Sequence, residues 1–284
     1  MMWILWVLIG LVVVLAVVVL WAVWPGKSTD ALREPFQDRN FAHRGLYEKD
    51  QSVPENSLPA FDAACLAGYG IELDVQFTKD KKLIVFHDDT LDRVAGAKGW
   101  VRDYPWEQVR AMPLMGTAEH PPLFTEVLKT VAGRTPLIVE IKSRHAYSGE
   151  YLDELCKATL DQLRDYEGDY CIESFDPRVV ARICKMAPNV LRGQLADATS
   201  SYRGEGTNWL YAFTLSHCLG NCMARPQFIA WCPAPRNAFI RLIHAMGAMM
   251  VYWTALPEHD AAALQRDNDA VIFQWYRPEP KWKR

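Results

Sequence analysis

The first 24 residues contain no charged side chain and no proline, which sets them apart from the rest of the chain. A helix of this length is about 36 Å long, enough to cross a bilayer. The stretch also lacks a basic n-region and a small-residue cleavage site, because Ala22-Val23-Trp24 ends on a bulky aromatic, and this argues against a cleaved signal peptide. We therefore expect one N-terminal transmembrane helix over residues 1–24, ended by Pro25-Gly26.

A clustered stripe of Lys and Arg is missing, and the formal net charge is -3, so the charge gives no reason to expect nucleic acid as a partner. No Lys or Arg precedes the span, whereas Lys27, Arg33 and Arg39 follow it, which favours a cytoplasmic C-terminal domain. The seven cysteines are odd in number and scattered, which favours reduced thiols over a disulfide framework. We expect a single-pass membrane protein whose globular domain lies in the cytoplasm.

A second C-x-x-C pair is also absent, which weakens the case for zinc. His217, Cys218, Cys222 and Cys232 are four possible ligands with C-x3-C spacing, and zinc bound there would be structural. Cysteine is often simply a small buried residue, and we prefer this interpretation for the cluster.

The chain after the span has the size and the alternation of one α/β domain. Residues 25–39 read as a short linker or first helix, and residues 40–284 fit a TIM-type (β/α)8 barrel with a small loop or cap insertion at 91–122. One of the nine predicted strands must be extra, either in the hairpin near Leu83 or at the end. The predicted strands are 40–45, 71–78, 83–86, 136–141, 170–175, 190–196, 228–232, 249–254 and 271–274; the predicted helices are 59–68, 106–112, 124–132, 151–164, 177–186, 236–246 and 257–266; and 198–208 is predicted to be a loop.

Ionisable side chains lie on or just after several of these strands. Glu72 and Asp74 are two residues apart in an alternating strand and point the same way, and His87 follows the next short run. Glu140 ends a later strand, and His43 ends the first. Because the carboxyl ends of barrel strands meet on one face, we expect these groups to converge there as a site for a hard divalent cation and proton transfer.

Several short motifs, in this order and spacing, resemble the glycerophosphodiester phosphodiesterase family over residues 40–275. They are Ala42-His43-Arg44-Gly45, Pro54-Glu55-Asn56-Ser57, Glu72-Leu73-Asp74-Val75, Thr78-Lys79-Asp80, Phe86-His87-Asp88-Asp89-Thr90-Leu91-Asp92-Arg93, Pro122-Leu123-Phe124-Thr125-Glu126-Val127-Leu128, Glu140-Ile141-Lys142 and Glu173-Ser174-Phe175-Asp176. The resemblance implies a TIM-type barrel, a divalent cation that is Mg²⁺ or Ca²⁺, and hydrolysis of a glycerol phosphodiester to an alcohol and a glycerol phosphate.

The same resemblance implies a role for individual residues. The implied metal ligands are Glu72, Asp74 and Glu140; the implied general acid and base are His43 and His87; the implied phosphate-contacting cations are Arg44 and Lys142; and Glu55 and Asn56 match a motif near the site. A span close to the domain makes lysophospholipids plausible substrates alongside soluble diesters. The alternatives are a phospholipase-type barrel that releases a cyclic phosphate, and a membrane-tethered barrel that binds a phosphorylated ligand or partner protein without turnover.

The chain departs from the family pattern near its end, at Trp253-Thr254-Ala255 and within Phe273 to Pro278. Trp253, Trp275 and Tyr276 could form an apolar wall for a lipid-like group. Ordinary packing of aromatic side chains in the barrel is the interpretation we prefer.

Overall fold

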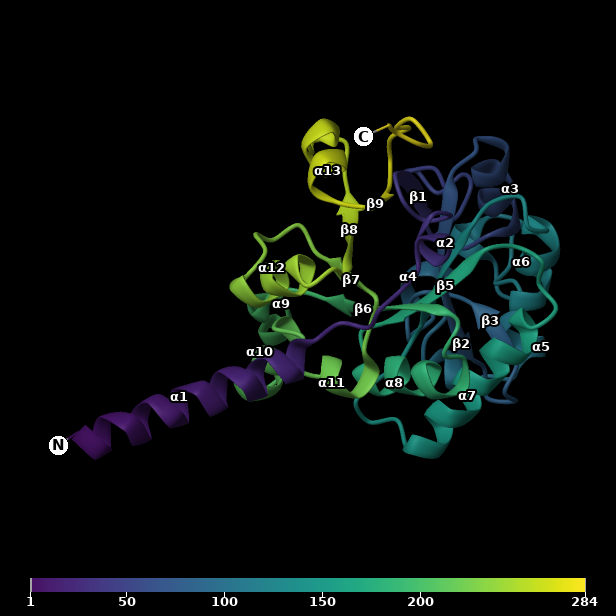
Figure 1. Ribbon diagram of the computed structural model, residues 1–284. Coiled ribbons are helices and arrows are strands. Elements are labelled where there is room, and N and C mark those ends of the chain that lie inside the picture. Colours follow the sequence, from purple (N-terminus) through teal and green to yellow (C-terminus); the bar gives the residue numbers. More distant parts are fainter. Residues whose placement is uncertain (1, 284) are drawn as a thin grey trace.

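The computed structural model describes residues 2–283, in which a long N-terminal helix projects from a parallel β/α barrel (Figure 1). Eight parallel strands follow the order β1-β9-β8-β7-β6-β5-β4-β2, and pairing of β1 with β2 closes the barrel. The ninth strand, β3, is antiparallel to β2 and lies outside the closed ring, so the extra strand is the one in the Leu83 hairpin. The strands are β1 (Arg39–His43), β2 (Gly70–Phe77), β3 (Leu83–Val85), β4 (Leu137–Ile141), β5 (Tyr170–Ser174), β6 (Leu191–Ala196), β7 (Phe228–Trp231), β8 (Met249–Ala255) and β9 (Ala270–Phe273).

Helices surround the barrel and cover its strands (Figure 1). Every residue of β2 and β4 is buried, as expected for parallel strands with a packed face on each side. The helices are α1 (Met2–Val23), α2 (Asp30–Arg33), α3 (Leu58–Leu66), α4 (Asp92–Ala95), α5 (Trp106–Val109), α6 (Phe124–Val131), α7 (Gly149–Leu163), α8 (Pro177–Met186), α9 (Thr199–Gly204), α10 (Trp209–Ser216), α11 (Asn221–Ala224), α12 (Ala238–Ala245) and α13 (Ala261–Asp267), with 3₁₀ helices η1 (Val101–Asp103) and η2 (Leu114–Gly116).

Capping side chains set where several helices begin. The Ser148 side chain accepts a hydrogen bond from the Tyr151 N–H, so α7 begins at Gly149, two residues before the predicted start. Asp260 accepts from the N–H groups of Ala262 and Ala263, so α13 begins at Ala261, four residues after the predicted start. Hydrophobic periodicity locates such a helix, whereas the cap fixes its first residue.

The prediction of a loop over 198–208 was wrong, because α9 occupies Thr199–Gly204. The segment is rich in Ser, Thr and Gly, which have low helix propensity, but tertiary packing holds the helix in place. Tyr202 is buried, and its ring packs edge to face on Phe175 with centroids 6.5 Å apart.

The predicted insertion is present between β3 and α6, with α4, η1, α5 and η2 inside it. It has an apolar cluster of its own, which includes Phe86, Leu91, Val101, Trp106 and Leu114. The insertion is therefore a packed unit attached to the barrel, and His87 lies at its beginning.

Two glycines make room for phenylalanine rings between neighbouring barrel strands. A Cβ atom at Gly70 would overlap the ring of Phe41, and one at Gly193 would overlap the ring of Phe228. Both rings are buried in the cluster formed by the barrel strands. These positions require glycine for space.

Gly193→Ala is expected to lower the free energy of unfolding by about 1–3 kcal/mol, because the added methyl group displaces the Phe228 ring inside a close-packed barrel. Urea or thermal unfolding measures the change. Gly204→Ala is the matched control, since nothing lies within 4 Å of a Cβ atom at that position. Equal unfolding midpoints for both variants would contradict the prediction.

Helix α1 is long and apolar enough to cross a membrane, by length and composition. Its side chains are largely exposed, apart from Val23 at its end, which is buried. The short helix α2 lies within residues 25–39, which were predicted to be a linker or first helix.

Candidate active site

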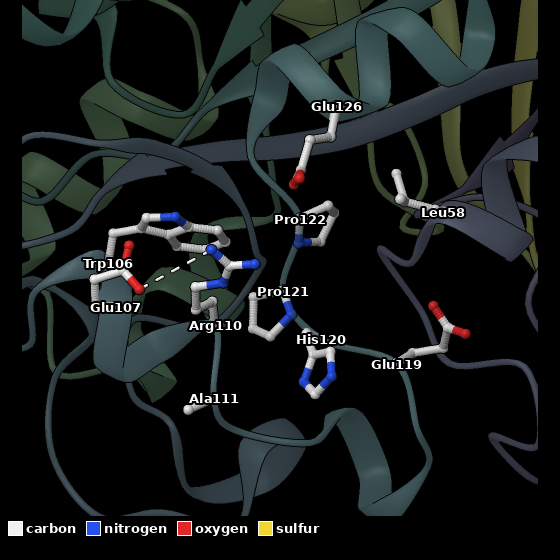
Figure 2. A pocket seen from close by; sticks show the side chains of 10 residues that line it. All are labelled: Leu58, Trp106, Glu107, Arg110, Ala111, Glu119, His120, Pro121, Pro122 and Glu126. Atoms are coloured by element: carbon white, nitrogen blue, oxygen red, sulfur yellow. Dashed lines mark ion pairs between the residues drawn. The ribbon is translucent and has the colours of Figure 1, made fainter.

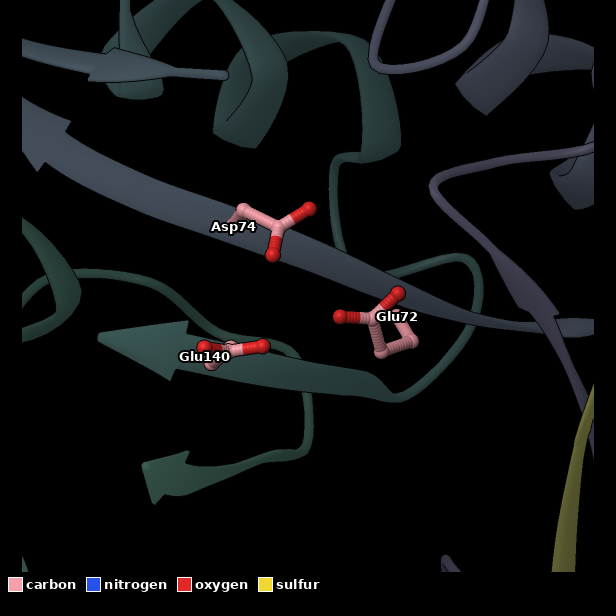
Figure 3. Close-up of side chains that lie close together, drawn as sticks. All are labelled: Glu72, Asp74 and Glu140. Atoms are coloured by element: carbon pink, nitrogen blue, oxygen red, sulfur yellow. The ribbon is translucent and has the colours of Figure 1, made fainter. Parts of the chain in front are cut away.

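Three carboxylates meet on neighbouring strands β2 and β4 (Figure 3). Glu72 and Asp74 project from the same side of β2, and Asp74 is opposite Glu140 in the register between the two strands. One oxygen from each of the three lies within 4.8 Å of the others. The predicted convergence of these acids is present in the structure.

The three carboxylates are almost completely buried, with 3%, 0% and 6% of Glu72, Asp74 and Glu140 exposed. Burial, together with the charge of Asp74, raises the pKa of Glu72 well above its usual value, and burial also raises the pKa of Glu140. Burial acts in the same direction on Asp74, but His87, Lys142 and Arg44 together lower the pKa of this carboxyl. Such crowding is costly without a positive charge among the acids.

The donor set fits a divalent cation. Asp74 Oδ1 is buried and accepts no hydrogen bond, although the Lys142 ammonium lies 3.4 Å away. A cluster of carboxylate oxygens is the kind of site that Mg²⁺ and Ca²⁺ prefer, whereas soft metals prefer thiolates. Glu72, Asp74 and Glu140 are therefore the residues that could hold the ion.

Two cationic side chains border the acids. Lys142 Nζ lies 2.9 Å from Glu140 Oε1, and although burial lowers the pKa of this ammonium, Glu140 and Asp74 raise it above its usual value. Arg44 Nε lies 3.9 Å from Asp74 Oδ2, and the Arg44 backbone N–H donates to Glu72 Oε2 at 3.1 Å. Positive charge is thus held beside the cluster.

His43, at the end of β1, has its ring held by a glutamine from the other end of the chain. Its Nδ1–H donates to Gln274 Oε1 at 2.7 Å, and the Tyr47 hydroxyl donates to the same oxygen at 3.0 Å. An amide oxygen can only accept, so the proton is on Nδ1, and Nε2, 3.8 Å from Glu72 Oε2, is left as the basic nitrogen. Burial and the charge of Arg44 lower the pKa of His43 to about 3, so the ring is neutral.

His87 follows β3, and its backbone and ring are both held. The Gln76 amide donates to the carbonyl oxygens of Phe86 and Asp88, at 2.7 and 2.8 Å, on either side of the histidine. Asp88 Oδ1 lies 2.7 Å from His87 Nδ1, and Arg93 Nε donates to Asp88 Oδ2 at 2.8 Å. As at His43, a hydrogen bond occupies Nδ1, and Nε2 is the other ring nitrogen.

Glu55 and Asn56, predicted to lie near the site, connect its parts. Glu55 accepts from both Arg44 and Arg93, each through a 2.7 Å hydrogen bond, which joins the surroundings of His87 to Arg44. Asn56 Nδ2 donates to Asp74 Oδ2 at 2.9 Å. Both residues therefore orient site side chains.

Part of this site, including both histidines, Arg44, Glu72 and Glu140, lines a small cavity of about 60 Å³. Glu173 adds a fourth carboxylate, whose pKa is raised well above its usual value by burial and by Glu140, and whose Oε2 accepts no hydrogen bond. Trp253 lines the cavity and packs edge to face on Phe175, with centroids 5.3 Å apart. The cavity is lined by His43, Arg44, Glu72, His87, Glu140, Glu173, Phe175, Leu195, Trp253 and Ile272.

Trp253 is thus the one residue of the three in the suggested aromatic wall that lines this cavity. Tyr276 packs on Phe273, with centroids 5.4 Å apart, and Trp275 is 39% exposed with Lys49 over its ring. The contact with Phe273 makes Tyr276 part of the ordinary aromatic packing, which is the interpretation we prefer.

A larger hollow, of about 490 Å³, lies elsewhere (Figure 2). It is formed by the insertion together with Leu58 and Glu126, and its Arg110 is 4.0 Å from Glu107. None of its lining residues belongs to the predicted site, so size does not identify the active site here.

The zinc hypothesis gains no support from the structure. Among residues 2–283, the group placed to share one ion is the cluster of three acids, and the set of His217, Cys218, Cys222 and Cys232 is not such a group. Burial raises the pKa of the Cys218 and Cys232 thiols to about 12, which opposes the thiolate that zinc requires.

The residues that sequence reasoning did not assign to the site include Gln274, Asp88, Arg93 and the cavity carboxylate Glu173. Asp88 and Arg93 stand in one of the motifs quoted above, so the motif was an available signal. Gln274 stands where the chain departs from the family pattern, and its contact with His43 spans 231 residues of sequence.

Comparison with known proteins agrees with the family resemblance of the motifs. Residues 43–274 match the model of the Glycerophosphoryl diester phosphodiesterase family. The chain is 34% identical over 162 residues to a glycerophosphodiester phosphodiesterase of Caldanaerobacter subterraneus subsp. tengcongensis, and 33% identical over 162 residues to one of Bacillus altitudinis. These alignments cover 54% and 53% of this chain, and 65% and 63% of the relatives' own lengths.

A solved structure shares the fold. It is a phosphodiesterase of Oleispira antarctica in complex with the product sn-glycerol-3-phosphate, with a TM-score of 0.65 and 19% identity, over 84% of this chain and 94% of the other. At this identity the likeness shows the fold alone, and it agrees with the TIM-type barrel predicted from the sequence.

Proposed function

Because the chain belongs to the glycerophosphoryl diester phosphodiesterase family, we propose that it hydrolyses glycerophosphodiesters to an alcohol and a glycerol phosphate. The observation that carries the proposal is a cavity lined by His43, His87, Arg44, Glu72 and Glu140, with Asp74 and Lys142 in contact with these acids. A phosphodiester anion repels nucleophiles, so its hydrolysis needs charge neutralisation together with a base and an acid. This cavity offers all three.

We assign Glu72, Asp74 and Glu140 as ligands of a divalent cation, Mg²⁺ or Ca²⁺. When bound, the cation would act as a Lewis acid on the phosphoryl oxygens. Arg44 contributes a planar fork of donors for those oxygens, and Lys142 a compact charge. The Arg44 guanidinium and the Lys142 ammonium hold the diester in the cavity.

The two histidines carry the proton transfers. One takes a proton from the nucleophile at Nε2, and the other gives a proton to the leaving alcohol oxygen. The nucleophile is water, or first the adjacent glycerol hydroxyl by way of a cyclic phosphate. Gln274 and Asp88 keep the two rings oriented through Nδ1.

Gln274→Leu is expected to lower kcat about 10- to 100-fold, as for loss of a partner that orients a functional histidine, with KM within about 2-fold of wild type. Steady-state kinetics measures the split between kcat and KM. Tyr47→Phe is the control, because it removes the second donor to Gln274 and leaves the Gln274–His43 hydrogen bond. A change confined to KM, or equal kcat losses in both variants, would refute the positioning role of Gln274.

We further propose that residues 1–24 anchor the protein in a membrane, that residues 25–39 link them to a barrel domain over residues 40–284, and that this domain lies in the cytoplasm. The apolar helix α1 supports the anchor, and the Lys and Arg residues after it support the orientation. Anchoring places the site near lipid, so the proposed substrates include lysophospholipids as well as soluble diesters.

The activity is tested with the purified full chain in detergent or vesicles, with Mg²⁺ or Ca²⁺ added. Glycerophosphocholine, glycerophosphoethanolamine and a lysophospholipid are offered in turn, and release of the alcohol is measured with EDTA as the control. Release that depends on the cation is the expected result. Lack of product from every substrate with either cation would refute the proposal.

A further inference from the structure

The C-terminal end of α1 is fastened to the barrel. The Asn221 amide donates to the Val23 carbonyl oxygen at 3.2 Å, and Arg225 Nη1 donates to the carbonyl oxygens of Trp21 and Trp24, at 3.0 and 2.8 Å. Val23 itself is fully buried. These contacts hold α11 against the last turn of α1.

The chain immediately after α1 is also fixed. The Gly26 N–H donates to the Pro226 carbonyl oxygen at 2.8 Å, and the Gln227 amide donates to the Lys27 carbonyl oxygen at 3.1 Å. A Cβ atom at Gly26 would overlap the Arg225 carbonyl oxygen, so the two segments approach as closely as glycine permits. The barrel therefore has a set orientation relative to α1.

An uncharged and apolar surface lies next to this junction. Residues 206–224, which include α10 and α11, contain no Asp, Glu, Lys or Arg. Trp209, Leu210 and Met223 in these helices are 59%, 67% and 54% exposed, and Trp24 at the end of α1 is 48% exposed. We call these four side chains the α10–α11 surface.

Among residues 24–283, eight large apolar side chains are exposed. Four of them belong to α10, α11 or the end of α1 beside α11, and the other four are scattered: Leu66, Met115, Met186 and Trp275. Gathered apolar side chains on a protein surface mark a contact with another apolar phase, whereas isolated ones need no explanation.

We propose that the α10–α11 surface rests in the interfacial layer of the bilayer that α1 crosses. The proposal rests on the membrane anchoring proposed above, because α1 then holds α11 at the level where the chain leaves the lipid. In Figure 1 the last turns of α1 run up to α11, with which α1 is in contact, and four residues separate α11 from α10. Tryptophan and aliphatic side chains without charges are typical of this layer, and Lys27, exposed three residues after Trp24, provides positive charge for lipid phosphates.

The α10–α11 surface is linked to the proposed catalytic site by a contact between α10 and the loop that carries Lys142. Helices α9 to α11 form the connection from β6 to β7, which leaves the barrel at the carboxyl end of β6. Tyr211 of α10 packs edge to face on His145, with centroids 5.0 Å apart, and His145 is three residues beyond Lys142. A lipid-bound α10 would therefore hold the loop that carries Lys142 close to the membrane, where lipid-derived diesters are present.

The test places the photoreactive residue p-benzoylphenylalanine at single positions of the full chain, reconstituted in vesicles of phosphatidylcholine and phosphatidylglycerol. The positions are Leu210 in the proposed contact, Val12 in the middle of α1, and Leu66, which is 77% exposed on α3 and serves as the matched control. After irradiation, mass spectrometry identifies lipid adducts. We expect adducts at Val12 and Leu210 and none above background at Leu66.

The three positions separate this proposal from the anchoring on which it rests. Adducts at Val12 without adducts at Leu210 would overturn the interfacial contact and leave the anchor standing. Absence of adducts at Val12 would overturn both. Adducts at Leu210 with a second protein in place of lipid would show that this surface binds a partner chain, and would also overturn the proposal, as would equal lipid labelling at Leu66.

Discussion

Glu72→Gln is expected to lower cation-dependent turnover by about 10³-fold or more, because one of the three proposed ligands loses its charge and the Lewis-acid contribution of several kcal/mol falls with it. The initial rate of alcohol release at saturating Mg²⁺ or Ca²⁺ measures this loss. Isothermal titration with the cation alone, in the absence of substrate, should show weaker binding by the same variant.

The fold of this variant should be preserved. Glu72 shares a buried space with Asp74 and Glu140, and mutual repulsion and burial raise its pKa, so a neutral amide of the same shape relieves the crowding. Its melting temperature in EDTA should therefore be no lower than that of wild type. Glu107→Gln, on the exposed side of α5, is the control for the substitution itself. Wild-type turnover in Glu72→Gln would remove Glu72 from the ion site.

His43→Ala and His87→Ala are each expected to lower turnover about 10²- to 10⁴-fold, the range of general acid–base catalysis. Each ring has its Nδ1 occupied and lines the same cavity, so each is placed to exchange a proton at Nε2. Single-turnover kinetics with a soluble diester measures the chemical step directly.

A double variant and a control sharpen the histidine prediction. If the two histidines act in one reaction, the double variant should lose much less than the product of the two single losses, because groups that act as a unit are not additive. His120→Ala, in the separate hollow, should keep full activity. If either single variant turned over at the wild-type rate, the assignment of two histidines would be wrong.

The core of the site could be predicted from the sequence because short stretches of sequence determine where its residues lie. Alternation along β2 places Glu72 and Asp74 on one side, and the register with β4 brings Glu140 opposite Asp74. The family motifs add the two histidines and the two basic side chains, Arg44 and Lys142. Both kinds of information lie within short stretches, so the barrel and the convergence of the acids follow from them.

The parts that escaped prediction depend on contacts between distant residues. Gln274 follows β9 and holds His43 at the end of the neighbouring strand β1, and Arg93 reaches Glu55 across 38 residues. No short pattern encodes such pairs. In the same way α9 is stabilised by the packing of Tyr202 on Phe175, while its own sequence is typical of a loop.

Strand β3 divides the site into two structural parts. The carboxylates belong to the closed ring of strands, whereas His87 is delivered by the antiparallel strand outside it and begins the insertion. Residues 94–123, beyond Asp88 and Arg93, could therefore diverge in length and shape, and carry new contacts for the departing alcohol, while the ion-binding strands kept their register. Selectivity for the head group and retention of the cation would then be free to evolve independently within one fold.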